Sequence, residues 1–414
     1  MSKVYKFPDG FLWGSATSAH QVEGGLLNDW TEWEKENAEN LTKEAKNKNT
    51  KWQQEKFPEM FDPKNYISGK TADHYRLYEK DFDILKDLGQ KVFRLSIEWS
   101  RIEPEEGKFD QKEIEHYKKV ILALKKRKIE PFVTLWHWSF PLWVSKIGGF
   151  ENKEIIKYFT RYTEKMAEAL PEVKFWITLN EPEVYASHSY LRGNWTPQKK
   201  SYLSYRKVIR NLVSAHKEAY TVLKKRIPSS KVCVAKHNVY FEAYKNKVVN
   251  KILKYFADSW WNDWFLKKVK GYQDILSLNN YHHNRINYGF NKNANKKVSD
   301  MAWELYPESL ALAAWELKKY NLPIYITEHG LADADDSRRE KFIKFSLACL
   351  HRAIERGADV RGYLYWSLLD NFEWDKGFWP RFGLVEVDFK TQKRTVRPSA
   401  FEYAEICKNN TLKI

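Results

Sequence analysis

The chain has 414 residues, of which 43% are hydrophobic and 16% aromatic, with only 17 Gly and 14 Pro; this composition excludes a disordered, collagen-like or low-complexity protein. Lys and Arg number 70 against 54 Asp and Glu, which gives a formal net charge of +16. No stretch approaches the roughly 20 uncharged apolar residues of a membrane helix, and residues 1–10 lack the apolar segment of a signal peptide. We therefore expect a cytoplasmic globular protein, and the three widely spaced cysteines fit reduced thiols in that compartment.

Short apolar runs alternate along the chain with longer segments of helical periodicity. Eight strands are expected, in chain order Phe11–Ala19, Lys91–Trp99, Glu130–Trp138, Lys174–Pro182, Lys231–Val239, Ile275–Tyr281, Pro323–Gly330 and Val360–Asp370. Most are near-continuous apolar runs, which is typical of parallel strands covered on both faces. The segments between them predict helices, including Thr71–Leu88, Gln111–Lys128, Asn152–Leu170, Tyr202–Lys225 and Ser337–Arg356.

Eight consecutive β–α units, with no Pro-, Gly- or Ser-rich linker, favour a closed barrel of the α/β class over a doubly wound sheet. We expect a single (β/α)8 TIM barrel that spans residues 1–414 as one catalytic domain. Two stretches fit no unit: Asn28–Lys56 is polar, and Asn284–Val298 has the composition of an exposed loop. Such stretches either build substrate subsites or are solvated insertions.

The excess of positive charge has two interpretations. An isoelectric point near 9.3 suits a protein that binds nucleic acid or a membrane surface. The lysines, however, are spread along helix-like segments such as Lys125–Lys128, acids are mixed among them, and no aromatic RNA-binding motif occurs. We interpret the charge as a solvated surface and expect neither nucleic acid nor a membrane as a partner; the oligomeric state stays open.

Polar side chains collect where the predicted strands end. His137, Asn180-Glu181 and Glu328 directly follow apolar runs, Asn279 and Tyr281 end another, and Glu373-Trp374 follow the last. In a barrel the loops after the strands form the active face, so Glu181 and Glu328 would face each other there. Two opposed carboxylates are the minimal equipment for glycoside hydrolysis, and 18 Trp offer faces on which sugar rings stack. The alternative is that both carboxylates form structural ion pairs and the tryptophans fill the core.

Four motifs, in the correct order along the chain, resemble those of family 1 glycoside hydrolases, the β-glucosidase family. Phe11–Gly24 (FLWGSATSAHQVEG) resembles the N-terminal signature, and Thr178–Pro182 (TLNEP) resembles the acid/base motif. Tyr325–Gly330 (YITEHG) is similar to the nucleophile motif, with His329 where Asn is usual. Trp366–Trp374 (WSLLDNFEW), followed by Arg381-Phe382-Gly383-Leu384, matches the C-terminal block. The resemblance runs from about Phe7 to Ala400.

The resemblance implies a role for each matched residue. Glu181 would be the general acid/base and Glu328 the nucleophile of a retaining double displacement, with carboxyl groups about 5–5.5 Å apart. The charge of Glu328 would help to raise the pKa of Glu181, so that the acid stays protonated. Arg94 would hold the nucleophile ionised and Tyr281 would donate a hydrogen bond to it. Without the family context, Arg94 would be an ion pair in the barrel floor and Tyr281 a packing residue.

The resemblance also implies which residues bind the substrate. The terminal sugar (the glycone) would be held by Gln21, His137, Trp138, Asn180, Trp366, Glu373 and Trp374. The leaving group (the aglycone) would meet Trp303 and Glu183, the latter a charged residue where a bulky apolar one is frequent. No metal and no cofactor is implied; His282-His283 would be a weak candidate for a metal pair.

The resulting hypothesis is a retaining exo-β-glycosidase that removes a terminal β-linked glucose, galactose or fucose from a β-glycoside or oligosaccharide. Pro380 and Phe382 stand where the 6-phospho-glycosidase branch has Lys and Tyr, which disfavours that branch. Ser139 and Asn280 also depart from the family pattern, outside the catalytic positions. The alternatives are a transglycosylase acting through the same site and a non-catalytic sugar-binding protein, which would be expected to have lost a carboxylate.

Overall fold

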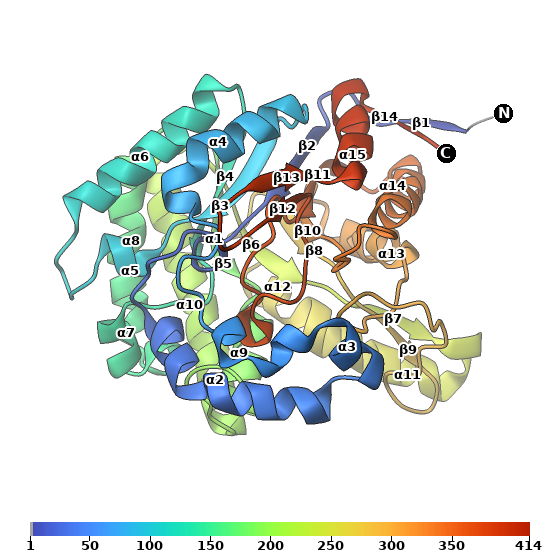
Figure 1. Ribbon diagram of the computed structural model, residues 1–414, viewed down its shortest axis with the longest axis horizontal. Helices are drawn as coiled ribbons and strands as arrows, with labels where there is room; N and C mark the ends of the chain where they lie inside the picture. The colour runs from blue at the N-terminus through green and yellow to red at the C-terminus, as the bar shows by residue number, and fades with distance from the viewer. Residues whose placement is uncertain (1–2) are drawn as a thin grey trace.

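A computed structural model describes residues 3–414 and contains a closed barrel of eight parallel strands (Figure 1). Around the barrel the strand order is β10-β11-β2-β3-β4-β5-β6-β8. The strands are β2 (Leu12–Ala16), β3 (Val92–Ser96), β4 (Glu130–Trp136), β5 (Phe175–Asn180), β6 (Lys231–His237), β8 (Leu276–Asn279), β10 (Ile324–His329) and β11 (Val360–Trp366). Each lies within one of the eight predicted ranges, so the predicted (β/α)8 TIM barrel is confirmed.

The barrel interior is filled with side chains. Val92, Phe132, Ile177, Ala235 and Leu364, from five different strands, form one buried apolar cluster. Strand β3 is buried at all five positions, because helices cover its outer face while the cluster covers its inner face. The inner apolar layer gives way to Arg94, Asn180 and Glu328 toward the carboxyl ends of the strands, so the polar side chains gather at one end of the barrel.

Long helices surround the strands, and the five for which the sequence predicts bounds begin and end close to those bounds. They are α4 (His74–Asp87), α6 (Gln111–Lys126), α8 (Ile155–Ala169), α10 (Tyr202–Arg226), α13 (Glu308–Leu317), α14 (Arg339–Glu355) and α15 (Pro398–Asn409). Short helices α1 (Ala19–Val22), α5 (Trp99–Ile102), α7 (Leu142–Lys146), α9 (Pro182–Ala186) and α12 (Trp264–Lys268) lie in the connections. The start of α6 is set by Asp110, whose side chain accepts hydrogen bonds from the amides of Lys112 and Glu113.

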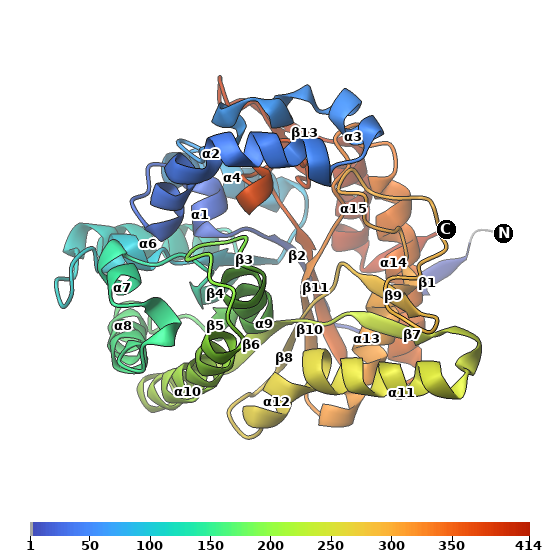
Figure 2. The same cartoon turned by 90° about the horizontal axis from the view of Figure 1, so that it is seen from below.

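The polar stretch Asn28–Lys56 forms two helices, α2 (Asp29–Lys48) and α3 (Lys51–Lys56). Asn28 and Thr31 form a reciprocal capping box at the start of α2. Trp30, Trp33 and Leu41 are buried on its inner face, so a sequence that is polar on average still contains a helical apolar stripe. Figure 2 shows α2 and α3 along one side of the barrel and α11 (Val248–Ala257) along the opposite side.

The stretch Asn284–Val298 is only partly the loop that was expected. Strand β9 (His283–Ile286) pairs in parallel with β7 (Tyr240–Ala243), so the prediction of a loop is wrong for Asn284–Ile286. These are the connections that follow two neighbouring barrel strands, and their proximity lets them pair. Residues 287–297 form no helix or strand.

The segments near the chain ends form two further antiparallel pairs, β1 (Val4–Lys6) with β14 (Thr411–Lys413) and β12 (Val385–Val387) with β13 (Arg394–Val396). The thiols of Cys233, Cys349 and Cys407 are buried and free. Within residues 3–414 no helix combines the length and apolar character needed to cross a membrane.

Candidate active site

Arg94 is the hub of a polar cluster at the carboxyl ends of the strands. Its fully buried guanidinium pairs with Oε1 of Glu328 and donates to Oδ1 of Asn180 (2.7 Å) and to Oγ1 of Thr134 (3.1 Å). The cluster thus joins strands β3, β4, β5 and β10 through one side chain. This placement is compatible with both sequence-based interpretations of Arg94. The residue forms a buried ion pair, and its partner in that pair is Glu328, the predicted nucleophile.

Glu328 lies one residue before the end of strand β10, and both of its carboxylate oxygens are engaged. Oε1 meets Arg94, and Oε2 accepts a hydrogen bond from the Tyr281 hydroxyl (3.0 Å). Burial raises the pKa of Glu328, while the Arg94 charge and the hydrogen bonds from Arg94 and Tyr281 oppose that rise. The group is therefore held by partners that favour its charged form.

Glu181 reaches the same place through a sharp change of chain direction. Strand β5 ends at Asn180, Glu181 adopts a left-handed backbone conformation (φ 41°), and Pro182 begins α9. The Glu181 amide donates to the carbonyl of Ala235 on β6 (2.8 Å), which holds this turn against the barrel. A non-glycine residue in this region costs conformational energy, and such residues concentrate at functional sites.

The Glu181 carboxyl has a neutral direct partner. Its Oε1 accepts a hydrogen bond from the Asn279 amide (2.7 Å). Burial, and next the negative charge of Glu328, raise the pKa of Glu181 to about 8. Of the two carboxyls, Glu328 has the cationic partner, so near neutrality the proton resides on Glu181. The pair thus combines a protonated carboxyl with an ionised one, as the predicted acid/base and nucleophile require.

The predicted glycone residues form a connected set beside this pair. The amide nitrogen of fully buried Gln21 donates to Asn371 Oδ1 (3.1 Å), the Phe372 carbonyl (2.9 Å) and Glu373 Oε2 (3.3 Å). Burial, and next the charge of Asp375, raise the pKa of Glu373 to about 8.

Asn180 connects this set to Glu328 through their common partner Arg94. Its amide nitrogen lies 3.0 Å from His137 Nε2, while its Oδ1 accepts from Arg94.

Four aromatic rings pack together here: His137 and Trp138 follow β4, Trp366 ends β11, and Trp374 lies in the connection after β11. The centroids of His137 and Trp366 are 6.0 Å apart, and those of Trp138 and Trp374 are 4.9 Å apart. Trp138 and Trp374 also have left-handed backbones (φ 77° and 49°), as Glu181 does. Trp195, which the sequence did not single out, packs against Trp138 at 4.8 Å and is 5% exposed.

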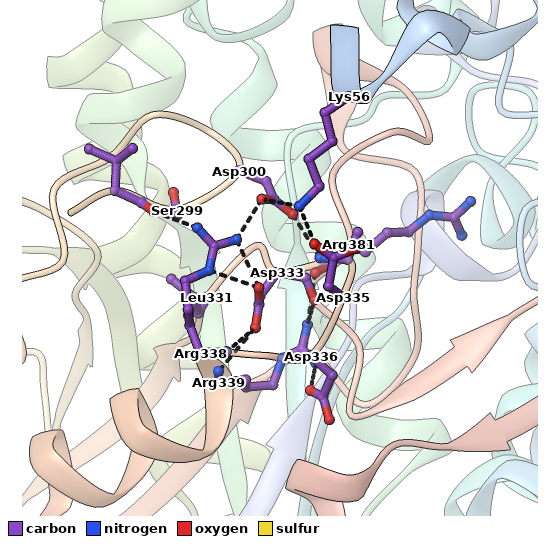
Figure 3. A network of polar contacts seen from close by, with 12 residues as sticks. Lys56, Ser299, Asp300, Leu331, Asp333, Asp335, Asp336, Arg338, Arg339 and Arg381 are labelled. Carbon is purple, nitrogen blue, oxygen red and sulfur yellow. Dashed lines mark hydrogen bonds and ion pairs between the residues drawn. The ribbon is translucent and has the colours of Figure 1, made fainter. Parts of the chain in front are cut away.

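Trp303 lies three residues after Asp300, which belongs to the network of ion pairs shown in Figure 3. Its ring packs against Tyr281 (5.8 Å). Nearby, the buried carboxylate of Asp300 binds Lys56 from the end of α3 (3.1 Å) and Arg338 (2.6 Å). Arg338 also binds Asp333 (2.8 Å). The network therefore ties α3 and the start of α14 to the segment that carries the predicted aglycone platform.

Glu183 does not present its charge to solvent. Its side chain is 3% exposed, and Oε1 lies 3.1 Å from Nζ of Lys236, which is 2% exposed and also donates to the His237 carbonyl (2.9 Å). The ion pair stands next to Glu181, two residues along the chain. The contact of Glu183 with an aglycone stays a prediction, and its partner in the structure is Lys236.

His329 and His283 have hydrogen-bond partners other than Glu181 and Glu328. His329 turns outward, where Nδ1 lies 2.9 Å from the Tyr363 hydroxyl and its ring stacks on Phe342. The two nitrogens of His283 face Glu304 (2.6 Å) and Glu242 (3.0 Å). Over residues 3–414 the structure places no group of three or more His, Cys, Asp or Glu suited to hold a metal ion.

Several residues that complete the site carry no motif by which the sequence identifies them. The sequence predicts Asn279 at a strand end but does not predict its hydrogen bond to Glu181. Thr327 Oγ1 in turn donates to Asn279 Oδ1 (2.7 Å). The sequence feature that could have identified Asn279 and Thr327 is their position in or at the end of an apolar strand, where a polar side chain needs a partner. Lys236 was visible only as a charge inside a predicted strand, where burial requires a partner.

Comparison with known proteins agrees with this geometry. The sequence model of glycosyl hydrolase family 1 matches residues 3–272 and 267–412. The chain is 33% identical to β-glucosidase A of Thermotoga maritima, with 99% of each chain covered, and 27% identical to a β-galactosidase of Saccharolobus solfataricus, over 99% of this chain and 96% of that protein. Among solved structures it resembles the β-glycosidase from Pyrococcus horikoshii (36% identity, TM-score 0.88, covering 100% of this chain and 97% of that one). It also resembles the Thermotoga maritima β-glucosidase in complex with glucoimidazole (30% identity, TM-score 0.86, covering 98% and 99%). The chain belongs to glycosyl hydrolase family 1 and is a glycoside hydrolase.

Proposed function

We propose that the protein is a retaining exo-β-glycosidase that releases terminal non-reducing β-linked sugars. The observation that carries the proposal is the contrast between two neighbouring buried carboxyls. Glu328 is held by Arg94 and Tyr281, whereas Glu181 is held by the neutral amide of Asn279. Such a contrast supports Glu328 as the nucleophile and Glu181 as the acid/base.

In the first step the Glu328 carboxylate attacks the anomeric carbon. The bond to the leaving oxygen breaks, and Glu181 gives its proton to that oxygen, so the aglycone departs as a neutral alcohol. The product is a glycosyl ester of Glu328. Its formation removes the negative charge that helps to raise the pKa of Glu181, so Glu181 is left as an effective base.

In the second step water attacks the anomeric carbon and gives a proton to Glu181. The ester bond breaks, and Glu328 leaves as a carboxylate. Arg94 and the Tyr281 hydroxyl stabilise the charge that returns to Glu328, because both contact it in the resting enzyme. Two inversions at the same carbon retain the β configuration.

The glycone is assigned to the connected set around Gln21. Gln21 and Glu373 would bind the outer hydroxyls, and Asn180 would bind the 2-hydroxyl, a contact that strengthens in the transition state. Trp366 would lie beneath the sugar ring, and His137, Trp138 and Trp374 would complete the pocket. Trp303, beside Tyr281, would be the platform for the aglycone, with Glu183 on the same side.

The names of the relatives support glucose, and also galactose, as the released sugar. Fucose, which differs from galactose only at the 6-position, is proposed as well. We also propose that residues 1–414 act as one catalytic domain in the cytoplasm; the buried free thiols and the pairing of β1 with β14 support this.

The test compares kcat/KM on nitrophenyl β-glucoside, β-galactoside, β-fucoside and 6-phospho-β-glucoside. We expect turnover of unphosphorylated sugars, and a loss of about 10³-fold or more in Glu328→Gln. The matched control is Glu386→Gln, an exposed glutamate on β12. Equal activity of wild type and Glu328→Gln would contradict the assignment of the nucleophile.

The stereochemical outcome is a separate measurement. Proton NMR should show the β-anomer of the released sugar before mutarotation, and the α-anomer first would contradict the retaining mechanism. An added alcohol acceptor measures how much of the glycosyl ester is transferred rather than hydrolysed.

A further inference from the structure

Helix α11 turns an apolar face to solvent. Val248, Val249, Ile252, Tyr255 and Phe256 are between 48% and 74% exposed, and they make up half of this ten-residue helix. Residues 248, 252 and 256 repeat every four positions and therefore share one face. Helices of a soluble domain normally direct such a stripe inward, so its exposure calls for an explanation.

The apolar face continues beyond α11. Trp260, on the π-helical turn that follows (Asp258–Asp263), is 50% exposed. These six side chains, Val248, Val249, Ile252, Tyr255, Phe256 and Trp260, are called the α11 surface. Tyr288 extends it from the connection after β9: its side chain is 64% exposed, and its amide donates to Asn250 Oδ1 on α11 (2.8 Å).

Positive charge surrounds the α11 surface. Residues 244–257 contain four lysines, residues 285–298 contain three lysines and one arginine, and neither segment contains Asp or Glu. Lys254 pairs with Glu316 (2.7 Å) and with Asp258 (2.8 Å), the acid in the turn that carries Trp260, and Arg285 pairs with Glu242 (2.7 Å). In the part of the chain that the structure describes, no ion pair engages the other six lysines. These two short segments, which contact each other, therefore carry six lysines whose charge no acid in that part of the chain compensates.

Lysines and aromatic rings are interleaved at the rim of this surface. Nζ of Lys247 lies 4.5 Å from the centre of the Tyr288 ring and 3.1 Å from its hydroxyl. Helices that lie in a lipid interface combine apolar side chains with aromatic and cationic side chains at their rim. The α11 surface has the same combination.

The charge decides between two occupants of the α11 surface. A second copy of the chain, docked symmetrically, would bring its own acid-free segments against these, and the like charges would repel. An anionic lipid surface offers apolar volume to the helix and phosphate charge to the lysines at once.

We propose that the α11 surface docks the protein on anionic lipid membranes. The side chains of Ile252, Tyr255 and Phe256 insert at the headgroup boundary, and Lys245, Lys247 and Lys251 contact the lipid phosphates. The sequence predicts no membrane partner on two grounds: it contains no membrane-spanning segment, and its lysines are spread along the chain. Docking of this kind requires no spanning helix, and the local charge only becomes apparent where the two segments meet.

The experiment is cosedimentation of the full chain with vesicles of phosphatidylcholine alone or of phosphatidylcholine and phosphatidylglycerol in equal parts. Wild type should sediment with the anionic vesicles only, and less as salt is raised. Ile252→Glu/Phe256→Glu should lower the partition coefficient by about tenfold or more.

The matched control is Phe345→Glu/Phe401→Glu, which places the same charges on exposed phenylalanines of α14 and α15, away from α11 (Figure 1). It should bind like wild type. Glycosidase activity and the melting temperature of each variant report whether it is folded.

Three results would overturn the proposal. Wild type that fails to sediment with anionic vesicles at low salt has no lipid-docking surface. Equal loss of binding in both double variants would show that added negative charge, and not α11, is responsible. Wild type that forms a dimer by sedimentation velocity, binds no vesicles and becomes monomeric in Ile252→Glu/Phe256→Glu would assign the surface to a second copy.

Discussion

Replacing Lys236 with methionine removes the cation that contacts the buried Glu183 carboxylate. The two charged atoms are 3.1 Å apart, and both side chains are almost fully buried. Removing one partner of a buried ion pair costs about 3–5 kcal/mol, because the other charge is left without compensation. At about 2.1 cal/mol/K per residue, the unfolding entropy of this chain is about 0.9 kcal/mol/K, so Lys236→Met should lower the melting temperature by about 3–6 °C.

The double variant Lys236→Met/Glu183→Met tests the reasoning behind that magnitude. Replacing both members of a buried pair by apolar side chains of similar size is often neutral or stabilising, so most of the lost melting temperature should return. Lys108→Met, which breaks an exposed ion pair with Glu105, is the control and should melt close to wild type. Differential scanning calorimetry measures all four proteins.

The same variants shift the pH dependence of catalysis. The Lys236 charge lowers the pKa of Glu181, which burial and the charge of Glu328 raise to about 8, so removal of Lys236 raises the pKa of Glu181 further. The alkaline limb of kcat/KM should therefore move to higher pH in Lys236→Met and in the double variant alike. A melting temperature of Lys236→Met within about 1 °C of wild type, or an alkaline limb that moves to lower pH, would refute the assignment of a buried pair that acts on Glu181.

Three further predictions concern the catalytic pair. In wild type, kcat/KM should be lost as pH rises through about 8, because the acid form of Glu181 is required and its raised pKa keeps that form populated below this value; an alkaline limb near pH 5 would contradict this. Glu181→Ala should lose about 10²–10⁴-fold in kcat/KM on alkyl glycosides but far less on dinitrophenyl glycosides, whose leaving group needs no proton, and equal losses on both would argue against a general acid. Tyr281→Phe should lower kcat/KM about 10–100-fold, the worth of one hydrogen bond to a charged group, while its melting temperature stays near that of wild type; unchanged kinetics would show that the hydroxyl does not act on Glu328.

The strands and their order could be predicted from the sequence because they depend on local pattern. Apolar runs such as Glu130–Trp136 are buried on both faces whatever their neighbours are, and parallel connection then puts all their carboxyl ends on one side. That side necessarily received Glu181 and Glu328. The family motifs added the expected roles, since motif order and spacing are properties of the chain itself.

Pairing between side chains required the tertiary structure. Asn279 meets Glu181 because β8 stands in register with β10, where Asn279 is opposite Glu328, and register is not encoded in periodicity. The partner of Glu183 was equally hidden, because Lys236 lies on a neighbouring strand more than fifty residues away. Trp195 joins the aromatic rings only through the path of the loop after α9.

Helices α2 and α11 show the same difference between what the sequence predicts and what the tertiary structure decides. Periodicity identifies an apolar stripe on each, but it does not say what covers that stripe. The connections at the mouth of the barrel cover the stripe of α2, where fully buried Trp30 packs against Trp195 and Trp374, whereas the stripe of α11 is exposed in residues 3–414. Whether a stripe is buried depends on which elements lie alongside it, so the tertiary structure decided that the apolar face of α11 is exposed. The amphipathic character that makes this face a docking surface was already present in the sequence.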